Sequence, residues 1–122
     1  MTALTVSMIV RDAETFLAAC LESVQALSPE IVIADTGSAD RSIAIAEGFG
    51  ARVIRIPWNN DFAEARNRAL AEAHGEWILS LDADEQLDAT AGASLPALLQ
   101  NNNASGYQVP IRNYVTNTRE RI

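Results

Sequence analysis

Short apolar runs alternate with helical patterns along the first 88 residues of the chain. Strands separated by helices favour right-handed crossovers, and each crossover brings the next strand back parallel to the one before it. The alternation therefore predicts an α/β domain with a Rossmann-like, mostly parallel sheet flanked by helices. The predicted strands are Leu4–Val10, Ile31–Ala34, Arg52–Ile56 and the run from Trp77 to Leu81. The predicted helices are one capped by Asp12 and ending near Gln25, one ending near Phe49, and Phe62–His74, which Gly75 ends.

The pattern weakens after Asp88. Leu95–Gln100 predicts one more helix and Tyr107–Ile111 a strand, and the polar end at 112–122 is typical of the edge of a fragment. With 122 residues, 48% of them apolar, we expect one domain over residues 1–122 that builds its own core.

The charge of the chain excludes several classes of protein. The formal net charge is −7, whereas a nucleic-acid-binding protein needs a basic surface, so we expect no nucleic-acid partner. All nine basic residues are arginine. The absence of lysine excludes a Walker P-loop, a Schiff-base enzyme and a receiver domain that depends on a lysine.

The apolar runs and the single cysteine predict where the protein is located and whether it contains disulfides. No apolar run approaches the roughly 20 residues of a membrane span, and the start of the chain lacks the charged region of a signal peptide. We therefore expect a cytoplasmic protein. The single cysteine, Cys20, lies in a predicted helix without a partner, and we expect it to fill the core.

Two aspartates, Asp82 and Asp84, follow the fourth predicted strand directly, with Glu85 beside them. The preceding Trp77–Leu81 run predicts a strand buried on both faces. Carboxylates at the carboxyl end of such a strand lie where open α/β sheets bind ligands, and closely spaced carboxylates favour a hard cation such as Mg²⁺ or Mn²⁺. The alternative is an acidic loop in which one aspartate caps a turn.

Polar clusters follow all four predicted strands, at positions that a parallel sheet brings to one rim. This convergence is stronger support for a ligand site than any single motif. Asp35, at the end of the second strand, is placed to accept a hydrogen bond from a base or a ribose; alternatively, Asp35 and Ser38 organise the turn and cap the next helix. The clusters are Arg11-Asp12 with Glu14, Asp35–Ser38, Asn59–Asp61 and Asp82–Glu85.

The helix at 62–74 begins with a capping box, in which Asp61 accepts from the helix and Glu64 reaches back. Arg66, one turn further on, lies near the helix start and could reach a base, ribose or phosphate, or form a solvated salt bridge. We interpret His74, the only histidine, as a cap residue of this helix and not as a catalyst.

Four segments together resemble the family 2 glycosyltransferases, which have the GT-A fold, and cover about residues 3–88. Their order and spacing match that family as well. The segment S-M-I-V followed by a basic residue, with D-F-A-E-A-R-N later, resembles the bacterial branch that includes lipopolysaccharide-core glucosyltransferases and peptide-modifying relatives. The segments are VSMIVRDAE (6–14), IVIADTGSADRS (31–42), WNNDFAEARNRAL (58–70) and WILSLDADE (77–85).

The resemblance implies a role for each motif. Val10, Arg11 and Glu14 would contact the nucleoside, and Asp35 would bind the base. The first motif of the family commonly ends in lysine-asparagine, and here it is Arg11-Asp12, which adds an acid near the donor.

The resemblance also implies a metal-dependent reaction. Arg66 would hold the donor nucleotide, Asp82 would lie near the ribose and the metal, and Asp84 would bind the Mn²⁺ or Mg²⁺ that bridges the diphosphate of a nucleotide sugar. A UDP-sugar is the expected donor. A single displacement would invert the anomeric centre, with a glycan, lipid or peptide as acceptor.

The general base of the family is a carboxylate well beyond the D-x-D segment, so the chain is expected to be an N-terminal, donor-binding part with incomplete acceptor chemistry. Apolar surface that the missing half would otherwise cover is expected to cause self-association. Two other hypotheses stay open: a non-catalytic nucleotide-binding or interaction module on the same fold, and a nucleotidyltransferase. The second usually needs a Gly-rich basic loop, which the segment after Val10 does not supply.

Overall fold

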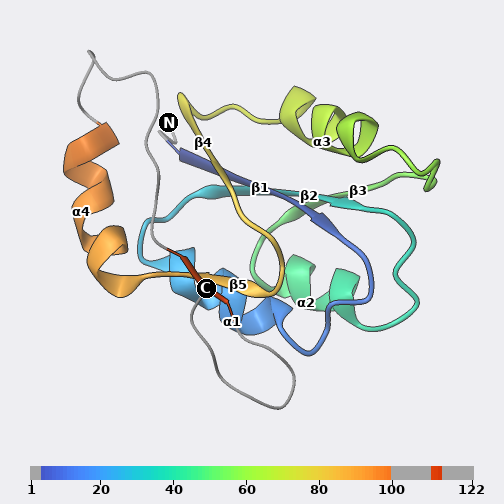
Figure 1. Ribbon diagram of the computed structural model, residues 1–122, viewed down its shortest axis with the longest axis horizontal. Helices are drawn as coiled ribbons and strands as arrows, with labels where there is room; N and C mark the ends of the chain where they lie inside the picture. Colours follow the sequence, from blue (N-terminus) through green and yellow to red (C-terminus); the bar gives the residue numbers. More distant parts are fainter. Residues whose placement is uncertain (1–3, 100–110, 114–122) are drawn as a thin grey trace.

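Four parallel strands form the centre of the molecule in a computed structural model that describes residues 4–99 and 111–113. Their order is β3-β2-β1-β4, and every pair is parallel, as Figure 1 shows. The predicted α/β class with a parallel sheet is therefore confirmed. The strands are β1 (Leu4–Val10), β2 (Glu30–Asp35), β3 (Arg52–Arg55) and β4 (Trp77–Ser80).

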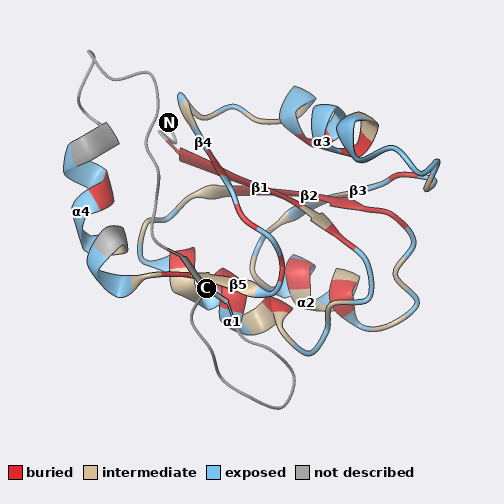
Figure 2. Cartoon of the chain, viewed as in Figure 1, coloured by how far each residue is buried: buried red, intermediate tan, exposed pale blue. Residues whose placement is uncertain are grey.

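Helices cover both faces of the sheet. On one side lie α1 (Leu17–Gln25) and α2 (Ser42–Gly48), and on the other lies α3 (Phe62–Ala71), as Figure 1 shows. The larger core cluster joins β1 to the buried face of α1, which carries Leu17, Cys20, Leu21 and Val24. The smaller cluster packs Ala65 and Ala69 of α3 on Val32 and Ala34 of β2. The two central strands are the buried layer in Figure 2.

The prediction that the fourth strand is buried on both faces is wrong. β4 lies at the edge of the sheet, paired only with β1 among the described strands. Leu79 faces the larger core cluster and is buried, whereas the side chain of Ile78, one residue earlier, is 41% exposed. Helix α3 covers β1 and β2 on that face and does not extend over β4, which leaves Ile78 partly exposed.

The helix boundaries differ from the predictions at two ends. Helix α1 begins at Leu17, with Phe16 at the N-cap position and no side-chain cap, so Asp12 is not its cap. Helix α3 ends at Ala71 with Glu72 as its C-cap, three residues before the predicted end. The prediction that His74 caps this helix is therefore wrong.

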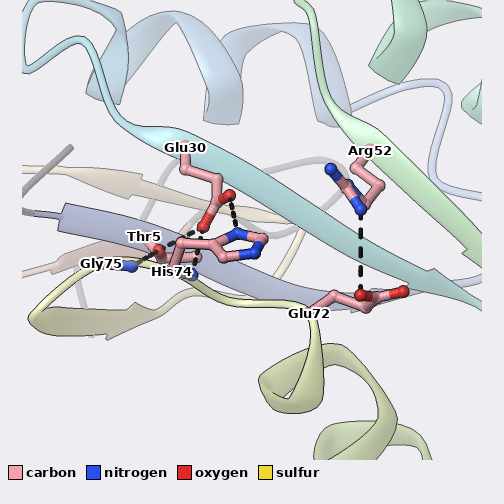
Figure 3. Close-up of polar contacts among 6 residues, drawn as sticks. All are labelled: Thr5, Glu30, Arg52, Glu72, His74 and Gly75. Carbon is pink, nitrogen blue, oxygen red and sulfur yellow. Dashed lines mark hydrogen bonds and ion pairs between the residues drawn. The ribbon is translucent and has the colours of Figure 1, made fainter. Parts of the chain in front are cut away.

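His74 instead belongs to a brace at the amino ends of the strands, drawn in Figure 3. Its Nδ1 lies 2.7 Å from Glu30 Oε2, and its backbone N–H donates to Glu30 Oε1 at 2.7 Å. Thr5 Oγ1 donates to Glu30 Oε1 and accepts from the Gly75 N–H. The brace ties the connection between α3 and β4 to the first residues of β1 and β2.

The chain after β4 forms elements that the sequence predicted less well. A short strand, β5 (Glu85–Leu87), pairs antiparallel with β6 (Ile111–Asn113) and was not predicted. Helix α4 (Ala89–Leu99) starts six residues before the predicted Leu95. The predicted strand at 107–111 lies outside the described residues except for Ile111. Within 4–99 and 111–113, no helix is long and apolar enough to cross a membrane.

Candidate functional site

The carboxyl ends of the parallel strands open onto a cleft of about 680 Å³. Backbone pairing aligns these ends, because Val10 of β1 lies beside Asp35 of β2, and Asp35 lies beside Arg55 of β3. The loops after β1, β2 and β4 and the start of α3 therefore meet at one rim. The charged residues of the cleft are Arg11, Asp12, Arg66, Asp82 and Asp84, and its other walls are Ile9, Ala13, Phe16, Thr36, Trp58, Phe62 and Ala83.

The acidic wall of the cleft is the turn after β4. Asp82 and Asp84 are exposed and line the cleft, and Ala83 between them is buried. Glu85 does not join them as a free carboxylate, since its Oε1 accepts from the Asp82 N–H at 2.8 Å and its own N–H donates to the Asp82 carbonyl at 2.9 Å. The turn thus presents two carboxylates to the cleft.

Two carboxylates suit a cation that a ligand helps to bind. No group of three or more His, Cys, Asp or Glu side chains in the described part of the chain is arranged to hold a metal ion. Mg²⁺ commonly takes one or two protein carboxylates and completes its shell with substrate phosphates and water. Asp82 and Asp84 fit such a shared site, in which a diphosphate would supply the missing oxygen ligands.

The basic wall combines Arg66 of α3 with Arg11 of the loop after β1, and both arginines are exposed. Asp61 begins α3 as predicted, because its Oδ1 accepts from the Glu64 N–H at 3.1 Å. Glu64 itself accepts from the Asn59 side-chain amide at 3.2 Å. This cap fixes the first turn of α3 and therefore the position of Arg66 at the cleft.

Asp35 lies in a second, smaller cavity of about 340 Å³ and not in the cleft itself. Its side chain is buried, and its Oδ1 accepts from the Gly37 and Ser38 N–H groups at 2.9 and 2.8 Å. Its Oδ2 is buried without a hydrogen-bond partner. An unsatisfied buried carboxylate oxygen is costly, so it indicates a place for a ligand donor. Arg55, Ile43 and Pro57 also line this cavity.

The structure bears out the turn-organising part of the structural alternative, because Asp35 Oδ1 accepts from the Gly37 and Ser38 N–H groups. Hydrogen bonding of Asp35 to a base or a ribose stays a prediction, to which its unpartnered Oδ2 is relevant. The part of that alternative that gave Ser38 a capping role is wrong. Ser38 Oγ accepts from the Asp12 N–H, and Asp40 Oδ1 accepts from the N–H of Ser42, the first residue of α2.

Two of the predicted contact residues line neither cavity. The Val10 side chain is buried in the larger core cluster, and its carbonyl accepts from the Thr36 N–H at 3.0 Å. Glu14 is exposed, and its backbone N–H donates to Asp40 Oδ2 at 3.1 Å. The structure thus gathers Arg11, Arg66, Asp82 and Asp84 in one cleft, with Asp35 in the neighbouring cavity.

An aromatic pair at the cleft was not singled out from the sequence. The rings of Trp58 and Phe62 meet edge to face, with centroids 4.8 Å apart and an interplanar angle of 65°. Both side chains line the cleft, and Phe62 is 64% exposed. The signal was present in the sequence: two aromatic residues bracket the polar turn that begins α3.

Cys20 lies beneath the acidic turn and takes no chemical part there. Burial, followed by the charges of Glu85, Asp84 and Asp82, raises the pKa of its thiol to about 12. Its Sγ lies 3.5 Å from the Asp82 carbonyl oxygen. A neutral, buried thiol is neither a nucleophile nor a metal ligand at neutral pH, and the expected role of Cys20 in the core is confirmed.

Comparison with known sequences finds the family described as "Glycosyl transferase family 2", whose profile matches residues 5–122. The chain is 32% identical over 131 residues to the lipopolysaccharide core biosynthesis glycosyltransferase LpsC of Rhizobium meliloti, covering 97% of this chain and 48% of that protein. It is also 43% identical over 109 residues to a TPR repeat-containing protein of Synechococcus elongatus, covering 89% of this chain and 27% of that protein. The chain therefore spans less than half the length of these relatives.

Two solved structures share the fold. Glucosyl-3-phosphoglycerate synthase from Mycobacterium tuberculosis, solved with Mn²⁺ and UDP-glucose, matches with a TM-score of 0.67 and 22% identity over 84% of this chain and 40% of that chain. The mannosyltransferase PcManGT from Pyrobaculum calidifontis, solved with GDP-mannose and Mn²⁺, matches with a TM-score of 0.69 and 18% identity over 83% of this chain and 33% of that chain.

Proposed function

The chain belongs to glycosyl transferase family 2, and we propose that it binds a UDP-sugar together with Mn²⁺ or Mg²⁺ as the donor-binding part of an inverting glycosyltransferase. The observation that carries the proposal is one cleft lined by the carboxylates of Asp82 and Asp84 and by the guanidinium groups of Arg11 and Arg66. A nucleoside diphosphate bound to a divalent cation needs both kinds of group.

Asp35 supports uracil as the base. Its Oδ1 already accepts two backbone hydrogen bonds, so Oδ2 is the carboxylate oxygen that still lacks a hydrogen-bond partner. Uracil offers one imide N–H, which a single acceptor satisfies. Guanine offers two neighbouring donors, N1–H and the exocyclic amine, and would leave one of them without a carboxylate oxygen.

The proposed transfer uses the residues of the cleft in distinct roles. Asp82 and Asp84 would hold the divalent cation, which when bound neutralises charge on the departing diphosphate. Arg11 and Arg66 would contact the nucleotide from the basic wall and orient it. An acceptor, whether a glycan, a lipid or a peptide, would attack the anomeric carbon from the side opposite the leaving group, and this displacement inverts that centre. The proposal keeps the predictions of a cytoplasmic location and of self-association.

Titration of UDP into the protein by calorimetry, with and without Mn²⁺, tests this function. We expect binding that requires Mn²⁺ and that Asp84→Ala abolishes. Glu47→Ala is the control, because it also removes one negative charge but lies near the end of α2, away from both cavities. Metal-independent binding would favour a non-catalytic nucleotide module, and an absence of binding would overturn the proposal.

A further inference from the structure

Four hydrogen bonds join the loop after β1 to the loop after β2. We call this set the loop clasp; it links residues 12–14 to residues 38–42. Three of its donors are successive backbone N–H groups of the first loop, and the fourth bond runs back to that loop. The bonds are Asp12 N–H to Ser38 Oγ (2.9 Å), Ala13 N–H to Ser42 Oγ (2.7 Å), Glu14 N–H to Asp40 Oδ2 (3.1 Å) and Ala39 N–H to Asp12 Oδ1 (2.7 Å).

Asp12 both donates and accepts a hydrogen bond in the clasp. Its N–H donates to the second loop, and its carboxylate accepts from the same loop. Its φ of 49° lies in the left-handed region, which aspartate and asparagine tolerate better than other residues with a Cβ. The backbone therefore turns sharply at Asp12, directly after Arg11.

The clasp connects the two cavities. Ser38 donates its backbone N–H to Asp35 Oδ1 in the smaller cavity, and its hydroxyl accepts from Asp12 at the cleft. Arg11, which lines the cleft, precedes the clasped turn. A change in the turn at Asp12 would therefore move Arg11 relative to the loop that holds Asp35.

We propose that Asp12 is a positioning residue for the donor nucleotide: its carboxylate holds the Ala39 N–H, and this bond fixes Arg11 in the cleft. The inference rests on the proposed function, since it assigns the residue that orients one of the nucleotide contacts. The function of the carboxylate is acceptance of a hydrogen bond and not its charge. Asparagine keeps an acceptor oxygen and tolerates the left-handed region, so it should fulfil the same role at this position.

The test measures the Kd of UDP with Mn²⁺ for wild type, Asp12→Asn, Asp12→Ala and Asp12→Gly, with Glu47→Ala as the charge control. We expect Asp12→Asn to bind within about twofold of wild type. Asp12→Ala should bind roughly 10-fold more weakly, because without this bond the loop that carries Arg11 must be ordered on binding. Glycine adopts the left-handed turn without strain, so any loss of UDP affinity in Asp12→Gly comes from the missing hydrogen-bond acceptor and not from the backbone.

A double-mutant cycle shows whether Asp12 acts through Arg11. We expect Arg11→Ala with Asp12→Ala to bind no more weakly than Arg11→Ala alone. Additive losses, equal losses in the asparagine and alanine variants, or a lower Tm with unchanged Kd would overturn the positioning role while wild-type binding stands. A wild type that binds no UDP would overturn the proposed function, and this role with it.

Discussion

Replacement of Gly75 by alanine should destabilise the protein without touching its ligand cavities. A Cβ at this position would lie 2.7 Å from both the backbone N and Oγ1 of Thr5, and 2.8 Å from the carbonyl carbon of Leu4. Two of these three atoms are backbone of β1, one of the two central strands of the sheet, so they cannot move aside cheaply.

The expected cost combines two effects. Forcing a methyl group into a filled site costs about 1–3 kcal/mol. The displacement also breaks or lengthens the bond from the Gly75 N–H to Thr5 Oγ1, now 2.9 Å, which contributes about 1 kcal/mol. The sum is about 2–4 kcal/mol, which for a domain of this size lowers Tm by roughly 10 °C or more.

Urea and thermal unfolding followed by circular dichroism measure this loss. Gly48→Ala is the matched control, because Gly48 is the last residue of α2 with nothing within 4 Å of an added Cβ, so alanine there should not destabilise the protein. Equal stabilities for the two variants would refute the close approach of Gly75 to β1. Since the brace lies at the amino ends of the strands, UDP affinity should change in neither variant.

The remaining predictions concern three carboxyl or thiol groups. Burial alone would raise the pKa of Glu30, but hydrogen bonds from His74 and Thr5 outweigh it and lower that pKa to about 2. The ionised carboxylate therefore stabilises the fold at pH values above about 4.5, its ordinary pKa, and this stabilisation should be lost as the pH drops from about 4.5 towards 2. Tm measured against pH should show that fall in wild type and lose it in Glu30→Gln. Cys20, with its pKa raised to about 12, should resist a thiol reagent at pH 8 in the native protein and react fully in urea; rapid native labelling would contradict its burial. Asp35→Asn should weaken UDP binding roughly 10-fold, since an amide that turns its NH₂ to either side loses an acceptor; calorimetry showing unchanged affinity would exclude Asp35 from base recognition.

The strands and the rim could be predicted because local pattern determines them. The boundaries of β1 match the prediction from Leu4 to Val10, since a mostly apolar run, interrupted only by Thr5 and Ser7, ends at two charged residues. The gathering of Arg11, Asp82 and Asp84 follows from strand direction, because parallel strands bring their carboxyl ends together. Arg66 joins them because the predicted cap at Asp61 places the start of α3 at the same rim.

What the sequence did not predict depends on contacts between distant residues. Asp12 reads as a helix cap, yet its carboxylate binds Ala39, which lies 27 positions along the chain, and α1 begins five residues later. His74 binds Glu30 in the same way, across 44 positions. The exposure of Ile78 depends on which strand lies at the edge of the sheet, and no local pattern encodes that order.

Paramagnetic broadening of backbone amide signals by Mn²⁺ tests the central claim most directly. With UDP present, substoichiometric Mn²⁺ should broaden the amides of Asp82, Ala83 and Asp84 first and then that of Arg11 across the cleft. The amides of His74 and Gly75, at the opposite end of the sheet, should stay sharp. Broadening centred away from the turn after β4, or broadening there that UDP does not enhance, would contradict a shared site for metal and nucleotide diphosphate.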